Sequence, residues 1–215
     1  MAQTEPARPP EGAPGRDLPA GLTARIVAAW RDSWGVARAE RAADPGEPRI
    51  LAYALGGCLA LWLASLPQEL RDSALGVGPT AEADPVLLVI ASLVSMLFFT
   101  PLALYGVAAL LRVALRLVGG TGGWRETRLA VFWSLLPAAP ALLLGYGAAF
   151  LLTVSGAGAL AGVPRLLAGL VWLRFWSVGL AEAHGFRSAW PIFAAIAALA
   201  LAFTLAGPGG PGAAG

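Results

Sequence analysis

The chain has 215 residues, of which 57% are hydrophobic and 13% are charged, whereas about a quarter of the residues in a soluble domain are charged. This balance excludes an ordinary soluble globular protein and indicates that lipid surrounds most of the chain. The formal net charge of +2 is too small to indicate nucleic-acid binding. All 15 basic residues are arginine, and the chain has no lysine and no asparagine, a usage associated with GC-rich bacterial genomes.

The leading segment divides into two parts. Residues 1–21 are rich in proline and glycine and have almost no large apolar side chain, so we predict a disordered cytoplasmic tail. Residues 22–49 form an amphipathic cytoplasmic helix, to residue 43, and a linker with two prolines. Two interpretations of the helix remain open. It lies at the inner membrane surface with Trp30 and Trp34 at headgroup depth, or it packs on the protein's own cytoplasmic loops.

Five apolar segments within residues 50–206 predict a membrane domain. The first, residues 50–66, is short, and Pro67 closes it. The second and third, residues 86–111 and 129–154, have 26 residues each without an ionisable side chain. At about 1.5 Å per residue each reaches roughly 39 Å, which crosses the roughly 30 Å hydrocarbon core with some tilt.

The loop between the second and third spans, residues 112–128, carries four arginines against one acid. Because arginine is retained on the cytoplasmic side, we place this loop inside and the acidic loop of residues 67–85 outside. Pro101, Pro137 and Pro140 each remove a backbone hydrogen bond, so we expect kinks in these two helices.

The last two spans are shorter. Residues 163–181 form the fourth, although Arg174 lies near its middle at an insertion cost of roughly 2.5 to 3.5 kcal/mol, and residues 189–206 form the fifth. Residues 207–215 form a disordered glycine- and proline-rich tail. Five spans place the amino terminus inside and the carboxyl terminus outside. The alternative has four spans, with the Arg174 segment in the interface and both termini inside.

The arginine distribution favours five spans. Seven arginines in the leading segment, four in the hairpin loop and Arg187 lie inside, twelve in all, whereas Arg71 and Arg165 lie outside. The first 49 residues contain no apolar core long enough for a secretory signal, so we expect no cleaved peptide.

No constellation typical of catalysis is present. Four glycines surround Thr121, but no Lys-Ser/Thr follows and no strand precedes them, so we expect a flexible turn and no nucleotide binding. Cys58 is the only cysteine and His184 the only histidine, which excludes a disulfide within the chain and a Cys or His metal cluster. We therefore expect no enzyme, no metal and no cofactor.

Three ionisable residues near the end of the fourth span are candidate functional residues. Arg174 has either a function or a structural role, since a charge in lipid is costly. Glu182 lies on the same helical face about 12 Å further along the axis, so a direct contact with Arg174 would be strained. A water-bridged contact with Glu182, or a contact of the guanidinium with the ring face of Trp172, Phe175 or Trp176, remains open. His184 either forms a pH-sensitive pair with Glu182 or is a polar loop residue that faces water.

Two stretches resemble the Yip family of Ypt/Rab-interacting membrane proteins, in its bacterial branch. Residues 119–137, GGTGGWRETRLAVFWSLLP, resemble the family's glycine turn, polar helix start and proline. Residues 179–185, GLAEAHG, resemble the turn before its last span. The resemblance implies a five-helix membrane domain with a cytoplasmic amino terminus. The structural motif residues that it implies are Gly119, Gly120, Trp124, Pro137 and Gly185.

Eukaryotic members of that family bind Rab GTPases in vesicle trafficking. Their Asp-Leu-Tyr-Gly-Pro element is missing before the first span here, so that role does not carry over.

Two functional hypotheses follow for a multi-pass protein of the bacterial inner membrane. The first is a non-enzymatic scaffold or adaptor in membrane organisation that works through helix and loop contacts. The second is a small transporter or permease component in which Arg174 and the three proline kinks line a path. Expected partners are membrane lipid and either other membrane proteins or a second copy, since Ala52, Gly56, Ala60 and Ala64 form a small-residue ribbon. No nucleic-acid or nucleotide partner is expected.

Overall fold

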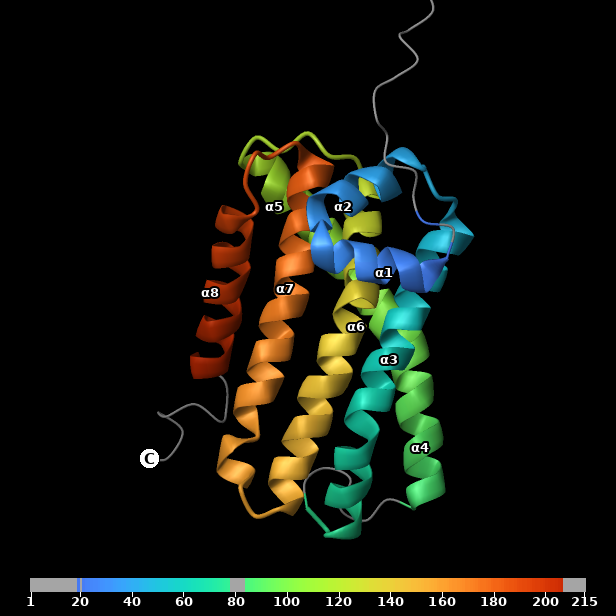
Figure 1. Ribbon diagram of the computed structural model, residues 1–215, viewed down its shortest axis with the longest axis vertical. Coiled ribbons are helices and arrows are strands. Elements are labelled where there is room, and N and C mark those ends of the chain that lie inside the picture. Colours follow the sequence, from blue (N-terminus) through green and yellow to red (C-terminus); the bar gives the residue numbers. More distant parts are fainter. Residues whose placement is uncertain (1–18, 20, 78–83, 207–215) are drawn as a thin grey trace, which may run out of the picture.

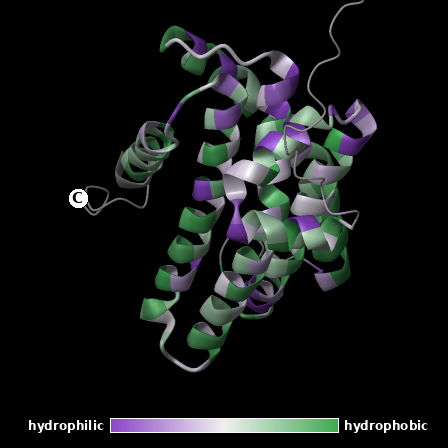
Figure 2. Ribbon diagram, turned by 45° about the horizontal axis from the view of Figure 1, so that its top comes forward, coloured by the Kyte–Doolittle hydropathy of each residue, from purple (hydrophilic) through white to green (hydrophobic). Residues whose placement is uncertain are grey.

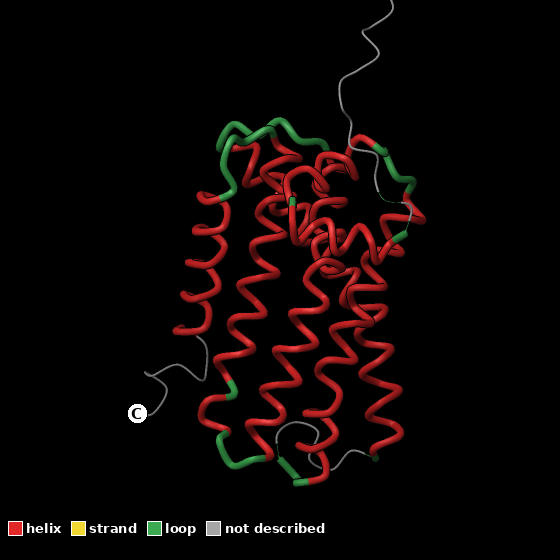
Figure 3. The backbone as a smooth tube through the Cα atoms, viewed as in Figure 1, coloured by secondary structure: helices red, strands yellow, loops and turns green. Residues whose placement is uncertain are grey.

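The computed structural model describes residue 19, residues 21–77 and residues 84–206. Within these residues the chain forms helices joined by turns, without a strand (Figure 3), which confirms the all-α prediction for the described part. The predicted tails, residues 1–21 and 207–215, lie almost entirely outside the described residues, as does part of the loop predicted to lie outside the membrane.

The leading segment forms two short helices, α1 (Leu22–Arg31) and α2 (Ser33–Ala42), in place of the single predicted helix. Asp32 separates them with φ −144° and ψ 80°. Its side chain accepts the backbone N–H of Gly35 at 2.8 Å and so satisfies a donor at the start of α2. Because of this break, the two helices cross one end of the bundle instead of continuing as one rod (Figure 1).

Four helical segments in the described chain are long and apolar enough to cross a membrane. The segment around Arg174 is one of them, and it packs beside the preceding span (Figure 1). α8 (Trp190–Ala206) is apolar but shorter than these four segments, and its 17 residues extend about 25 Å. The four segments are α3 (Glu47–Ala74), α4 with α5 (Pro85–Leu117), α6 (Trp124–Val154) and Gly158–His184, which contains α7 (Gly162–His184).

α3 continues through Pro67 to Ala74, so the prediction that this proline closes the first span was wrong. A proline lacks the N–H that a regular helix needs, but helices in membrane proteins tolerate it where neighbouring groups compensate. The Ser65 hydroxyl lies 2.8 Å from a carboxylate oxygen of Glu69 and so connects the turns on both sides of the proline.

A π-helical turn, Ser95–Phe99, separates α4 (Pro85–Val94) from α5 (Thr100–Leu117). Pro101 is the second residue of α5 and has no N–H for the carbonyl of Leu97, four residues earlier. A π-turn is a common irregularity at such positions. The kink predicted at Pro101 stays a prediction, and the irregularity that the structure shows beside it is this π-turn.

The helices extend further than predicted at the end where α1 and α2 lie. α5 runs to Leu117 and α6 begins at Trp124, so the arginines assigned to a loop of residues 112–128 lie on helix ends. α7 likewise runs to His184 and includes Glu182, which corrects the turn predicted for residues 182–188. Arginine is a good helix former, and a helix need not stop where the apolar run stops.

α6 is the central helix and packs between α3 and α7 (Figure 1). Glycines permit both close approaches: a Cβ on Gly57 would clash with Leu135, and one on Gly145 would lie 2.6 Å from the Cβ of Ala168. α4 and α5 contribute mostly exposed apolar side chains, which suits a helix that faces lipid. Figure 2 shows hydrophobic residues along the long helices and hydrophilic ones mainly around α1, α2 and the neighbouring loops.

Candidate functional site

Charged side chains join α1 and α2 to the ends of α3, α6 and α7. We call this assembly the cap: α1, α2 and the helix ends and loops that they contact. Its ion pairs connect residues far apart in the sequence, so the cap is a tertiary structure and not a loose leader. The pairs are Arg25–Glu40, Arg49–Glu40, Arg38–Glu182, Arg41–Glu182, Arg125–Asp44 and Arg128–Glu47.

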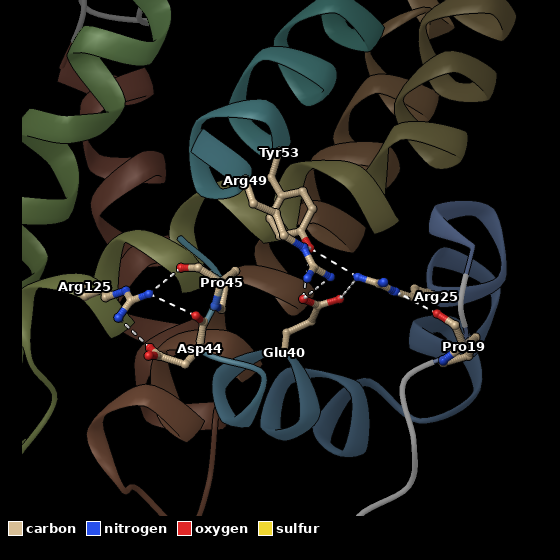
Figure 4. Close-up of polar contacts among 8 residues, drawn as sticks. All are labelled: Pro19, Arg25, Glu40, Asp44, Pro45, Arg49, Tyr53 and Arg125. Atoms are coloured by element: carbon tan, nitrogen blue, oxygen red, sulfur yellow. Dashed lines mark hydrogen bonds and ion pairs between the residues drawn. The ribbon is translucent and has the colours of Figure 1, made fainter. Parts of the chain in front are cut away.

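Glu40, on α2, is the centre of the first cluster and is only 1% exposed. Its carboxylate lies 3.1 Å from Arg25 Nη1 and 3.7 Å from Arg49 Nη2. The Tyr53 hydroxyl donates to it at 3.0 Å, and Arg49 Nε donates to that hydroxyl at 2.6 Å. Figure 4 shows these side chains converging from α1, α2 and α3. The cluster therefore fastens both leading helices to the first span.

Burial raises the pKa of Glu40 above its ordinary value, against the Tyr53 hydrogen bond and the charge of Arg25, which lower it. Two arginines and a tyrosine do not fully replace the water that this carboxylate loses. A proton is therefore held more tightly at Glu40 in the folded cap than in water.

A second row of ion pairs fixes the linker between α2 and α3 to the start of α6. Arg125 Nη1 reaches the Asp44 carboxylate at 2.6 Å, and Arg125 Nη2 donates to the Pro45 carbonyl, also at 2.6 Å (Figure 4). Arg128 donates to Glu47 at 2.9 Å, and its guanidinium carbon lies 5.1 Å from the ring centre of Trp124. Trp124, a motif residue implied by the resemblance, therefore supports an arginine over its ring face.

Glu182 joins α7 to α2. Its carboxylate oxygen lies 2.9 Å from Arg41 Nη2 and 3.4 Å from Arg38 Nε. The structure thus brings Glu182 into contact with arginines of the leading segment, and the predicted water-bridged contact with Arg174 is replaced by these direct ones. Sequence spacing along α7 could not show this, because the partners come from a separate helix.

His184 is buried, 1% exposed, so the prediction of a loop residue that faces water was wrong. Its Nε2 lies 3.0 Å from Thr127 Oγ1 on the first turn of α6. Its backbone carbonyl accepts the N–H of Thr121 at 3.1 Å. His184 therefore joins the end of α7, the glycine-rich loop and the start of α6, and its ring partner is Thr127 and not Glu182.

The hydrogen bonds assign the proton on this ring. Thr127 Oγ1 lies 2.8 Å from the carbonyl oxygen of Gly123 and gives its single proton to it. The hydroxyl oxygen must then accept from His184, which places a hydrogen on Nε2. Nδ1 of the ring is buried without a hydrogen-bond partner. The imidazole acts here as a donor that holds two helices together.

Glycine is needed where the loop meets this ring. A Cβ on Gly120 would lie 2.7 Å from His184 Nδ1, and one on Gly122 would lie 2.7 Å from the carbonyl oxygen of Ala183. Gly119, at φ 90°, and Gly185, at φ 75°, have the left-handed backbone that side chains disfavour. The loop predicted to be a flexible turn is therefore closely packed on the end of α7.

Pro137 is buried, and its carbonyl oxygen accepts the indole N–H of Trp30 at 2.8 Å. The Trp30 ring also meets Phe175 of α7 edge to face at 5.5 Å. Of the two interpretations of the leading segment, these contacts favour the second, in which it packs on the protein itself. It packs, however, on helices more than on loops.

Arg174 is exposed on α7, and its guanidinium carbon lies 5.6 Å from the ring centre of Phe175. It lines a groove of about 540 Å³ between α7 and α8, together with Trp34 and Arg187. Arg174 thus lies apart from the contacts of Glu182 and His184. The three predicted site residues occupy three different environments.

The residues missed in the sequence are chiefly Glu40 and Thr127. Glu40 follows Ser33 and Val36 on one face of α2, and all three are buried. An acid on an otherwise uncharged face of a helix was the signal in the sequence that could have identified it. Nothing near Thr127 in the sequence indicates its contact with His184, 57 positions away. Within the described residues no His, Cys, Asp and Glu cluster of metal-binding type occurs.

A comparison with known families identifies the family of this chain. The family model of the Yip1 domain matches residues 37–208, from the middle of α2 through α8 and over most of the chain. No curated protein and no solved structure matches the chain. The match includes the glycine loop, His184 and Glu182, so the resemblance inferred from the sequence is confirmed. This membrane protein therefore belongs to the Yip1 domain family.

Proposed function

We propose that the protein is a non-enzymatic scaffold or adaptor of the bacterial inner membrane, and that its cap contacts another membrane-associated protein. The observation that carries the proposal is a crevice of about 810 Å³ between α1 and α2. Its walls are mainly apolar, although it lies at the charged end of the molecule. Ala24, Val27 and Val36 are among the residues that line it.

An apolar crevice on a polar surface is a typical place for a partner to bind. Val27 is 47% exposed there. The ion pairs of Glu40 hold α1 and α2 in a fixed arrangement, so a partner need not order them on binding. A fixed, partly apolar surface supports an adaptor more than an enzyme.

The proposed topology has five spans with the cap in the cytoplasm. The arginines of the cap end support this orientation, because Arg71 and Arg165 lie at the other end of the long helices. α8 runs beside α7 as the proposed fifth span (Figure 1). A carboxyl-terminal alkaline phosphatase fusion tests this topology, and we expect it to be active. An inactive phosphatase fusion, together with fluorescence from a second carboxyl-terminal fusion that fluoresces in the cytoplasm, would contradict five spans.

A transporter is not proposed. The groove that contains Arg174 is lined by residues of α2, α7, α8 and the loop before α8. Pro101, Pro137 and Pro140 are not among them, so the arginine and the proline positions do not line one path.

Site-specific photocrosslinking in native membranes tests the adaptor function. A photoreactive phenylalanine analogue replaces Val27, and the matched control replaces Val118, which is 68% exposed on the loop before α6. We expect a discrete crosslinked protein from position 27 and none from position 118, and we expect Ala24→Asp to abolish it. Adducts with lipid alone, or equal capture at both positions, would contradict the proposal.

A further inference from the structure

The groove between α7 and α8 has an apolar wall and a charged end. It holds about 540 Å³, and Trp34 of α2 borders it. Leu170 and Val178 lie about 12 Å apart along α7, so the groove follows the helix over roughly two turns. Figure 1 shows α7 and α8 side by side there. The remaining lining residues are Val171, Arg174, Ser177, Arg187, Ser188, Ala189, Trp190 and Phe193.

Two guanidinium groups line this groove, and no described acid pairs with either of them. Arg174 belongs to a span whose other residues are mostly apolar, where an unpaired charge is costly. Arg187 lies on the loop before α8. An anionic group between them would supply the missing counter-charge.

Several arginines of the cap differ from Arg174 and Arg187 because they have acid partners. Arg25 and Arg49 pair with Glu40, and Arg125 and Arg128 pair with Asp44 and Glu47. The cap therefore satisfies its arginines internally wherever they hold its helices together. Arg31, Arg112, Arg116 and Arg165 also have no acid partner among the described residues, but Arg174 and Arg187 differ from them in lining one groove together.

We propose that this groove binds an anionic glycerophospholipid. Arg174 and Arg187 hold the phosphate, and one acyl chain lies along Leu170, Val171 and Phe193. The long arginine side chain reaches toward the polar end while its stem stays on the apolar wall. The Ser188 hydroxyl lines the same groove and accepts the backbone N–H of Trp190 at 3.3 Å, so its own proton is free to be donated to a headgroup oxygen.

The position of the groove in the bundle favours a lipid over a free anion as its ligand. The groove lies on the side of a membrane helix, and its neighbours Leu166 and Leu167 are 63% and 57% exposed. A phospholipid reaches this side within the bilayer, whereas a free phosphate gains nothing from the apolar wall. The charged end and the apolar wall together match the two parts of one lipid molecule.

Native mass spectrometry of the full chain in detergent tests the proposal. Dioleoyl phosphatidylglycerol is compared with dioleoyl phosphatidylcholine, which has the same chains but no net charge. We expect one phosphatidylglycerol to bind at least about tenfold more tightly, about 1.4 kcal/mol. Equal binding of the two lipids would overturn the role of the arginines. Competition by glycerol 3-phosphate at the same concentration would overturn the lipid assignment.

Variants locate the lipid. Arg174→Gln and Arg187→Gln should each weaken phosphatidylglycerol binding by about tenfold. The matched control is Arg165→Gln, which removes the same charge near the other end of α7 and should leave binding unchanged. Val171→Trp fills the apolar wall and should weaken both lipids while both arginines remain. An equal loss in all three arginine variants would overturn the site and indicate a general charge effect.

Discussion

Trp30 donates its indole N–H to the carbonyl oxygen of Pro137 at 2.8 Å, across 107 positions of the sequence. The donor lies on α1 and the acceptor on α6, so this single bond ties the leading segment to the central helix. The Trp30 ring keeps a second contact with Phe175, on α7. The hydrogen bond and the ring contact can therefore be separated by substitution.

Trp30→Phe removes the bond and retains an aromatic ring at the contact. We expect α1 to open more easily by about 1 kcal/mol, the usual contribution of one hydrogen bond. In limited trypsinolysis of reconstituted protein, cleavage after Arg31 should then be about fivefold faster. The control is Trp190→Phe, at a tryptophan that is 73% exposed. An unchanged rate would show that the indole bond does not hold α1 in place.

Gly122→Ala tests the close packing of the glycine loop. The new Cβ would lie 2.7 Å from the carbonyl oxygen of Ala183 and 2.9 Å from the ring of His184. We expect a loss of about 1–3 kcal/mol in unfolding free energy, the usual cost of overpacking. Gly147→Ala is the control, because its Cβ meets nothing within 4 Å. Thermal unfolding in detergent should separate the variants, and equal melting temperatures would contradict a packed loop.

The long apolar segments could be predicted because apolarity alone determines which part of a chain enters lipid. Helix ends could not be predicted, because a helix continues beyond the apolar run while its backbone hydrogen bonds persist. Arg112 lies beyond the predicted end of the second span, and Arg128 lies before the predicted start of the third, yet both belong to helices. The helix break at Asp32 was missed for a different reason. It depends on one side chain that caps the next helix, and an uninterrupted apolar spacing concealed it.

The candidate site was harder to predict because its contacts join distant residues. His184 has polar neighbours in the sequence and looked exposed, but the glycine loop covers it in three dimensions. Glu182 stays a predicted functional residue, and its ion-pair partners belong to α2 and not to α7. The motif glycines and Pro137 were found through the family resemblance. The structure shows a close contact at Gly120 and a left-handed backbone at Gly119 and Gly185.

Thr127→Val tests the hydroxyl that accepts from His184. Valine has nearly the same shape but leaves Nε2–H buried without a partner. The expected loss is about 1–3 kcal/mol, the cost of an unsatisfied buried donor. Thr127→Ser keeps the hydroxyl and should recover most of that loss in the same thermal unfolding experiment. Equal destabilisation by valine and serine would mean that the methyl group, and not the hydrogen bond, is what matters.

Glu40→Gln tests the raised pKa of the buried acid. In the unfolded chain Glu40 titrates near its ordinary value of 4.5, and in the folded cap at a higher pH. The folded protein therefore binds more protons between these two pH values, so the stability that this group contributes falls as pH rises through the window. Arg25, Arg49 and Tyr53 are the charged and polar groups that face the carboxylate.

Glutamine does not titrate, so the comparison isolates this one group. The melting temperature of Glu40→Gln should rise relative to wild type as the pH is taken from 4 toward neutrality, about pH 7. Glu126→Gln is the control, since it removes an acid from the first turn of α6 that takes no part in the Glu40 cluster. If Glu40→Gln instead loses stability relative to wild type on the same change, the arginines lower the pKa by more than burial raises it. The Glu40 ion pairs would then stabilise the folded cap more at neutral pH than in acid.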